Sequence, residues 1–322
     1  MTIQYFHFPA ASRWQTVCAL LLLAQAPAHG ADLKIESLKN ATAKTSPLTV
    51  KELEEAEPLP SREVTPEALE DMRRRFRELN PDTLRIERKS SADTLAKGVP
   101  SKVADPSANN PYWSTGKLTF TKKSDGKLKR CTAQFVDDLK VILTAAHCVY
   151  DVDAKGWNSN FTFQRAYSDG TAAQTVSWRC LSIFDAYHAP SENLAYDYAF
   201  ILADKNDEQA PLVMTTGIPV AAPLTAIGYP QTHGGGKFLY KVDGDWASVD
   251  RGIVTMSGNP MRGGNSGGAW FSSFKVDGRS GENLVISLNS HHLEGNDTDE
   301  NGPEFTADTV RLKEHVRDGK CL

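Results

Sequence analysis

The sequence predicts an all-β fold that follows a polar N-terminal third. From Pro111 onward, short β-rich segments bounded by turn residues recur, which is typical of an all-β barrel or sandwich. Before Pro111 the chain is polar, charged and poor in aromatic residues. Hydrophobic residues make up 40% of the 322 residues and charged residues 24%, so the chain can bury an ordinary globular core.

The expected strands form two successive groups, each separated internally by turn residues. The first group covers residues 117–121, 132–136, 141–144, 161–167, 175–184 and 198–202. The second group covers residues 224–228, 237–242, 252–256, 269–271 and 284–289. Residues 308–316 then predict a C-terminal helix with a polar tail.

The N-terminus predicts an export signal. Arg13 precedes an apolar run, Val17–Ala26, and small residues follow at Ala26-Pro27-Ala28. This order is typical of a secretory signal peptide, which we assign to residues 1–31, although a buried N-terminal helix is the alternative. The run is too short to span a bilayer as a mature helix, and no later segment is apolar enough to do so. We therefore expect a secreted protein, extracellular or periplasmic.

Residues 32–109 are predicted to be a propeptide with one amphipathic helix. Thr65 can cap this helix, Pro66 suits its first turn, and Pro81 bars its continuation. Its apolar face is formed by Leu69, Met72, Phe76 and Leu79. We expect the helix to dock on the domain behind it, and a disordered linker is the alternative.

Three short strings carry the residue types of a hydrolase. They are Leu143-Thr144-Ala145-Ala146-His147-Cys148, Tyr196-Asp197-Tyr198-Ala199-Phe200 and Gly263-Gly264-Asn265-Ser266-Gly267-Gly268. Each string alone is weak evidence, because a lone histidine, a turn-capping aspartate and a glycine-flanked serine are all common. Their combination in one chain points to catalysis.

Acyl transfer explains why these residue types belong together. A serine hydroxyl such as that of Ser266 needs a base to take its proton, and His147 can act as that base. Asp197 can hold the imidazole in one tautomer. Glycines beside the serine permit a tight turn with uncovered amides, so we expect Gly264 and Ser266 to form the oxyanion hole.

The order His, Asp, Ser and the surrounding strings resemble the chymotrypsin-fold serine peptidases, most closely the bacterial branch of V8-like glutamyl endopeptidases. Pro111-Tyr112-Trp113-Ser114, Cys131-Thr132 and Gly228-Tyr229-Pro230 are similar to segments of that branch, although Ala133 replaces a glycine. Asn265 before the serine is also typical of it. The resemblance covers Asn110 to Val316, about two thirds of the chain.

The resemblance implies two six-stranded antiparallel β-barrels with the triad in the cleft between them. The peptidase domain would then be 110–322, with one barrel at about 110–205, the second at about 206–305 and a C-terminal helix at about 308–316. Loss of Cys18 with the signal leaves four cysteines, which allow three connectivities from sequence alone. The resemblance implies Cys131–Cys148 beside the histidine, and Cys180–Cys321 remain to pair.

Substrate specificity is less determined by the sequence. Pro260 stands six residues before Ser266, and its lack of charge argues against a trypsin-like pocket. The branch implies a histidine and a threonine for glutamyl specificity, but these positions align with Asn289 and Met261. A shift of two residues would restore His291.

Two further expectations concern the strand after the serine. His291 and His292 are either specificity residues or exposed loop residues. The resemblance implies that Ser290 hydrogen-bonds Asp197.

Asn265 also bears on activation. It carries no charge, so the ion pair with a freed N-terminus that animal digestive peptidases use is absent. We hypothesise that the prosegment acts by steric block or folding assistance, with cleavage between Arg88 and Asn110, for example after Lys97 or Lys102.

One acidic segment resembles the opening of a calcium loop. Its oxygen-bearing residues are Asp297, Asp299, Asn301 and Asp308. The flanking helices of such a loop are missing and Pro303 is atypical, so a solvated acidic turn is the alternative.

These observations predict a secreted serine endopeptidase that needs no cofactor and acts on protein or peptide substrates. The formal net charge of −4 and isoelectric point near 6.1 exclude a strongly basic protein that binds nucleic acid or an anionic membrane. We expect a monomer. The alternative function is a catalytically inactive binding protein of the same fold.

Overall fold

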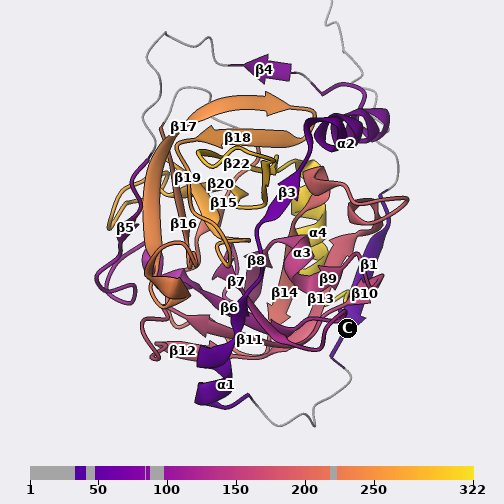
Figure 1. The fold of residues 1–322 in the computed structure, drawn as a ribbon. Coiled ribbons are helices and arrows are strands. Elements are labelled where there is room, and N and C mark those ends of the chain that lie inside the picture. The colour runs from indigo at the N-terminus through magenta and orange to yellow at the C-terminus, as the bar shows by residue number, and fades with distance from the viewer. Residues whose placement is uncertain (1–32, 41–47, 84, 88–97, 218–222) are drawn as a thin grey trace, which may run out of the picture.

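The computed structural model describes residues 33–40, 48–83, 85–87, 98–217 and 223–322 (Figure 1). The expected signal peptide and the candidate cleavage site after Lys97 lie outside these residues. Among the described residues, no helix is long and apolar enough to cross a membrane.

Two large sheets form the body of the molecule. The first has the strand order β1-β13-β14-β8-β7-β6-β11-β12, with β2 also pairing β7. All its pairings are antiparallel except β2 with β7. Its strands are β1 (Ile35–Lys39), β2 (Glu57–Pro58), β6 (Thr115–Thr121), β7 (Leu128–Phe135), β8 (Val141–Thr144), β11 (Ser159–Arg165), β12 (Gln174–Val176), β13 (Trp178–Phe184) and β14 (Ala199–Ala203).

The second sheet has the order β15-β20-β19-β16-β17-β18-β22-β21-β3, with β4 and β5 also pairing β17. Its strands are β3 (Arg62–Val64), β4 (Arg85–Glu87), β5 (Ser101–Lys102), β15 (Val213–Met214), β16 (Pro223–Gly228), β17 (Tyr240–Asp250), β18 (Ile253–Ser257), β19 (Ala269–Ser272), β20 (Leu284–Leu288), β21 (His291–Leu293) and β22 (Asp299–Pro303). A small hairpin joins β9 (Tyr150–Asp151) and β10 (Gly156–Trp157). The all-β fold class is therefore confirmed.

Among the described residues, the sheets hold nine and eleven strands, more than the expected six each, and the N-terminal third accounts for part of the excess in both. Strands β1 and β2 extend the first sheet, and β3, β4 and β5 extend the second (Figure 1). The expectation that residues 32–109 hold only one helix is thus incomplete. The sequence did not predict these added strands because they are short and are held by backbone pairing, without a clear alternating apolar pattern.

In the described part of the chain, four α-helices complete the fold: α1 (Val50–Glu55), α2 (Pro66–Leu79), α3 (Ala146–Val149) and α4 (Ala307–Arg317). Helix α2 is the predicted amphipathic helix, and the Thr65 side chain accepts a hydrogen bond from the Ala68 amide as its N-cap. Its buried residues include Phe76, whose ring centroid lies 5.3 Å from that of Tyr196. The helix therefore packs against the chain segment that carries Tyr196, as expected.

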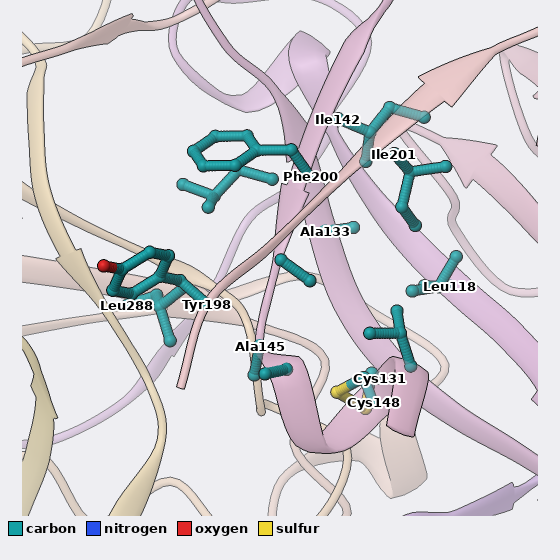
Figure 2. Packing of buried hydrophobic residues seen from close by; sticks show 14 of the residues in the cluster. Leu118, Cys131, Ala133, Ile142, Ala145, Cys148, Tyr198, Phe200, Ile201 and Leu288 are labelled. Atoms are coloured by element: carbon teal, nitrogen blue, oxygen red, sulfur yellow. A yellow bond between two sulfur atoms is a disulfide. The ribbon is translucent and has the colours of Figure 1, made fainter. Parts of the chain in front are cut away.

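The core connects the two sheets around α3. Phe200 and Ile142 of the first sheet and Leu288 of the second belong to one buried cluster. Figure 2 shows the disulfide between Cys131 and Cys148 at α3. A second disulfide, Cys180–Cys321, ties the tail after α4 to β13. Both pairs are those named from the sequence.

Candidate active site

The fold brings His147 and Asp197 into direct contact. His147 lies in α3, directly after β8, and its backbone amide donates to Asp197 Oδ1 at 2.9 Å. Its Nδ1 lies 2.8 Å from Asp197 Oδ2. Two contacts to one carboxylate fix both the backbone and the ring of the histidine. This is the arrangement that holds an imidazole in a single tautomer.

Asp197 is fully buried and held ionised by its neighbours. The hydroxyl of Ser290 donates to Asp197 Oδ2 at 2.5 Å, as expected from the sequence. Burial alone would raise the pKa of Asp197, but His147 and the hydroxyl of Ser290 more than offset it and lower the pKa below its ordinary value. The carboxylate can therefore stabilise an imidazolium.

The other ring nitrogen of His147 is unused. His147 Nε2 is buried and has no hydrogen-bond partner among the described residues. Ser266 lies on the loop between β18 and β19, and its carbonyl accepts from the Thr132 amide at 2.8 Å, which fixes that loop against β7. Only 2% of Ser266 is exposed. An imidazole with one nitrogen bound to a carboxylate and the other free can act as a base.

Gly264, the expected oxyanion donor, adopts a backbone conformation that favours glycine. Its φ of +81° lies in the left-handed region that favours glycine. A Cβ at Gly264 would stand 2.5 Å from Arg130 Nη1 and 3.0 Å from the Tyr229 carbonyl oxygen. The packing of Arg130 and the backbone of Tyr229 therefore both require glycine here.

Arg130 of β7 packs beside Gly264 and holds the loop that follows β16. Its guanidinium donates to the Tyr229 carbonyl oxygen at 3.0 Å and to the Gly235 carbonyl oxygen at 3.1 Å. Burial lowers the pKa of Arg130 to about 10. This arginine is a positioning residue that the sequence did not reveal.

The two aligned specificity positions hold neutral, fully buried side chains. Asn289 Oδ1 accepts from Trp270 Nε1 at 2.7 Å and from Asn259 Nδ2 at 2.9 Å, so it belongs to the framework. Met261 has no exposed surface. Neither residue carries a charge that could bind a carboxylate of a substrate.

The adjacent histidines are not exposed loop residues, and that alternative is wrong. His291 and His292 both lie in β21 and both are buried. Burial lowers the pKa of His291 to about 3, so this imidazole stays neutral. His292 Nε2 lies 3.4 Å from Glu63 Oε1 of the N-terminal third. Neutral His291 offers no positive charge to an acidic substrate side chain.

A buried contact between Arg262 and Glu300, beside Met261, was missed in the sequence. Arg262 Nη1 contacts Glu300 Oε2 at 2.8 Å, and Glu300 is 2% exposed. Burial raises the pKa of Glu300 to about 8, against the opposing effect of Arg262. Arg262 also donates to the carbonyl oxygens of Asp299 and Asn296, at 2.8 and 3.2 Å. The guanidinium thus joins the loop before Ser266 to β22 and the turn before it.

The largest departure from expectation is a segment of the N-terminal third, residues 57–64, that lies across this site. It pairs in parallel with β7 through β2 and in parallel with β21 through β3. The amide of Gly264 donates to the Leu59 carbonyl oxygen at 3.0 Å, and the amide of Gly263 donates to Ser61 Oγ at 2.7 Å. We call residues 57–64 the cleft segment.

The cleft segment also fills the space beside His147. A cavity of about 140 Å³ is lined by residues 59–63 of this segment together with His147 and Glu192. Arg62 forms an ion pair with Glu192. The chain's own backbone and side chains thus occupy the surroundings of the candidate triad.

The acidic set proposed for calcium is not gathered in the described part of the chain. Among the described residues, the side chains close enough together to share a metal ion are Cys131, His147 and Cys148, and none of Asp297, Asp299 and Asp308 is among them. Asn301 Oδ1 accepts from Thr255 at 2.7 Å, and Asp308 lies in α4 and contacts Arg311 at 3.1 Å. Calcium binding stays a prediction from the sequence pattern alone. The cysteines nearest His147 form a disulfide and are not free to bind a metal.

No protein-family model and no curated protein sequence matches this chain. Solved structures do match. The thermostable serine protease AL20 from an extremophilic microorganism aligns at 22% identity and a TM-score of 0.54, over 63% of this chain and 96% of that one. The protease Anisep from Arthrobacter nicotinovorans gives 22% and 0.54, over 68% and 98%.

A Glu endopeptidase in complex with MPD aligns at 20% identity and a TM-score of 0.57, covering 69% of this chain and 98% of its own. At these identities the likeness shows the fold. The chain has the two-barrel fold of the chymotrypsin-like serine peptidases, and nearly the whole of each neighbour corresponds to about two thirds of it.

Proposed function

We propose that this chain is an exported serine endopeptidase that is made as an inactive precursor. The observation that carries the proposal is the state of His147, whose Nδ1 contacts Asp197 Oδ2 at 2.8 Å while its buried Nε2 is left without a partner in the described structure. A base with one nitrogen oriented by a carboxylate and the other available is what serine catalysis requires. The fold of the solved neighbours supports the same reading.

In the proposed mechanism, Ser266 attacks the carbonyl carbon of a peptide bond. Nε2 of His147 takes the hydroxyl proton and then gives it to the leaving amine, while Asp197 stabilises the imidazolium. The amides of Gly264 and Ser266 donate to the developing oxyanion. Water then releases the acyl group by the reverse transfers, with no cofactor.

The cleft segment supports a precursor that is blocked sterically. The Leu59 carbonyl oxygen already accepts the Gly264 amide, so a substrate carbonyl cannot reach that donor until the segment leaves. The peptide bond after Leu59 joins it to Pro60, so the nitrogen that would leave if this bond were cleaved belongs to a proline ring. We propose that a cut between Arg88 and Asn110 begins activation, after removal of the signal peptide 1–31.

Labelling with a fluorophosphonate probe tests the proposal. We expect the full-length chain to label slowly. The cut chain, meaning the chain cleaved between 88 and 110 and freed of the piece N-terminal to the cut, should label rapidly. Ser266→Ala should abolish the labelling, and the control Ser273→Ala, outside the site, should leave it intact. A cut chain that folds but never labels would favour the alternative of an inactive binding protein.

A further inference from the structure

The side chain of Arg62 lies in a site formed by residues C-terminal to the N-terminal third, which we call the main body (residues 110–322). Its guanidinium pairs with Glu192, and only 16% of the Glu192 side chain is exposed. Glu192 Oε1 accepts from the hydroxyl of Tyr187 at 3.1 Å, while Oε2 faces Arg62. Tyr187 has no exposed surface. One carboxylate oxygen is thus fixed by a buried donor and the other is presented to a cation.

The loop that carries Glu192 is held by its own domain. The Asn193 amide donates to the Tyr187 carbonyl oxygen at 2.7 Å, which closes the loop on itself. The side chain of Asn193 accepts from the Ala195 amide at 3.2 Å and caps the turn that leads to Asp197. These contacts do not depend on the cleft segment, although Arg75 and Met72 of α2 also bond the backbone or side chains of this loop.

The charge around this site favours a cation. The cavity shared by Arg62 and His147 is lined by three carboxylates of the main body, Glu192, Asp151 and Asp153. Apart from His147, the basic side chain that the main body contributes to the described lining is Lys122, which lies 3.9 Å from Asp151. Without Arg62 the lining is net negative. Burial alone would lower the pKa of Arg62, and Glu192 raises it above its ordinary value.

The site lies within reach of the candidate triad. Arg62 stands opposite His291 in the pairing of β3 with β21, and His291 directly follows Ser290, which contacts Asp197. An extended peptide that pairs with β21 would place a side chain at the position that Arg62 now holds.

We infer that Glu192 is the recognition group of a subsite for a basic side chain, lysine or arginine, of the bound peptide substrate, and that Arg62 holds this subsite in the uncut chain. The inference rests on the proposed function, because it needs a substrate in the same cleft. A charged hydrogen bond to a largely covered carboxylate such as that of Glu192 discriminates against neutral side chains.

Cleavage of a peptide library by the activated chain tests the inference. We expect one position of the cleaved peptides to be dominated by lysine and arginine. For a peptide of that sequence and its norleucine analogue, Glu192→Gln should lower the ratio of the two kcat/KM values about tenfold or more, mainly through KM. The matched control Glu314→Gln, in α4, should leave the ratio unchanged.

Two results would overturn the inference: no basic preference at any position, or a ratio in Glu192→Gln equal to that of the unaltered chain. Tyr187→Phe removes the donor to Glu192 and should shift the ratio in the same direction by a smaller factor. Fluorophosphonate labelling separates the two proposals. A chain that labels but shows no basic preference loses only the subsite, whereas a folded, cut chain that does not label loses the peptidase function.

Discussion

The amide of Gly264 donates a 3.0 Å hydrogen bond to the carbonyl oxygen of Leu59, two residues that are far apart in the sequence. The proposed oxyanion donor is therefore already in use by the chain itself. Glu63 and His292, 3.4 Å apart, hold the same segment further along β21. In the uncut chain, the cleft segment therefore occupies the groups that a substrate would need.

Gly264→Ala should damage catalysis rather than binding. The new Cβ would stand 2.5 Å from Arg130 Nη1, on a residue whose φ is +81°, so the amide must move. Loss of one oxyanion donor typically lowers kcat about 10²- to 10³-fold, which steady-state kinetics of the cut chain would measure. Gly126→Ala is the matched control, because its φ is +67° but open space surrounds it. Equal losses in both variants would show that backbone strain, not the donor, is responsible.

Arg75 should hold the precursor closed. From α2 its guanidinium donates to the carbonyl oxygens of Ser191 and Glu192, at 2.8 and 2.6 Å. Arg75→Ala removes charged hydrogen bonds to that loop, so labelling of the uncut chain by a fluorophosphonate should accelerate about tenfold. Arg74→Ala is the control, because Arg74 contacts only exposed residues of its own helix, Asp71 and Glu78. An Arg75→Ala precursor that labels no faster than the control would contradict steric closure by this helix.

Ser290 should act as a positioning residue for Asp197. Ser290→Ala removes the 2.5 Å hydrogen bond to the carboxylate and should lower kcat about tenfold, with Ser290→Thr restoring part of it. Because the folded pKa of Asp197 lies below its ordinary value of 3.8, its stabilisation is present above that pH and is lost as the pH falls. The variant should therefore lose stability near neutral pH and lose less near pH 3, as denaturant titrations at several pH values would show. A stability loss that is the same at every pH would argue for a packing effect alone.

Glu300 should make the fold less stable as the pH rises. Its folded pKa of about 8 exceeds the ordinary value of 4.5, so between these values the folded state holds a proton that the unfolded state has released. The free energy of unfolding should fall by roughly 1.4 kcal/mol per pH unit within that window because of this group. Glu300→Gln should flatten the dependence, as urea titrations from pH 5 to 8 would show. An unchanged slope would place the pKa of Glu300 near its ordinary value.

The sequence predicted the parts of this fold whose pattern is local. The strands around His147 and the helix capped by Thr65 have clear periodicity and clear boundaries, and the structure contains them. The string around Asp197 likewise identified the residue that contacts His147. Local signals of this kind need no knowledge of distant partners.

Other features depend on partners far along the chain. Strand β22 contains Asp299, Glu300 and Gly302, a composition that reads as a calcium loop or turn, yet backbone pairing with β18 makes it a strand. Similarly, β2 and β3 span only two and three residues, and Pro58 in β2 argues against a strand. Pairing with distant strands overrides the local secondary-structure preference of these residues. In the same way, no local signal in the sequence identified Glu192 as the partner of Arg62.

Strand β1 pairs over its full length with β13, from Ile35 opposite Phe184 to Lys39 opposite Cys180. A single backbone break after residue 87 would therefore yield a nicked, two-piece particle that migrates as one species until it is denatured. The N-terminal piece would remain bound as an inhibitory subunit, and full activation would require its dissociation or a further cut within it.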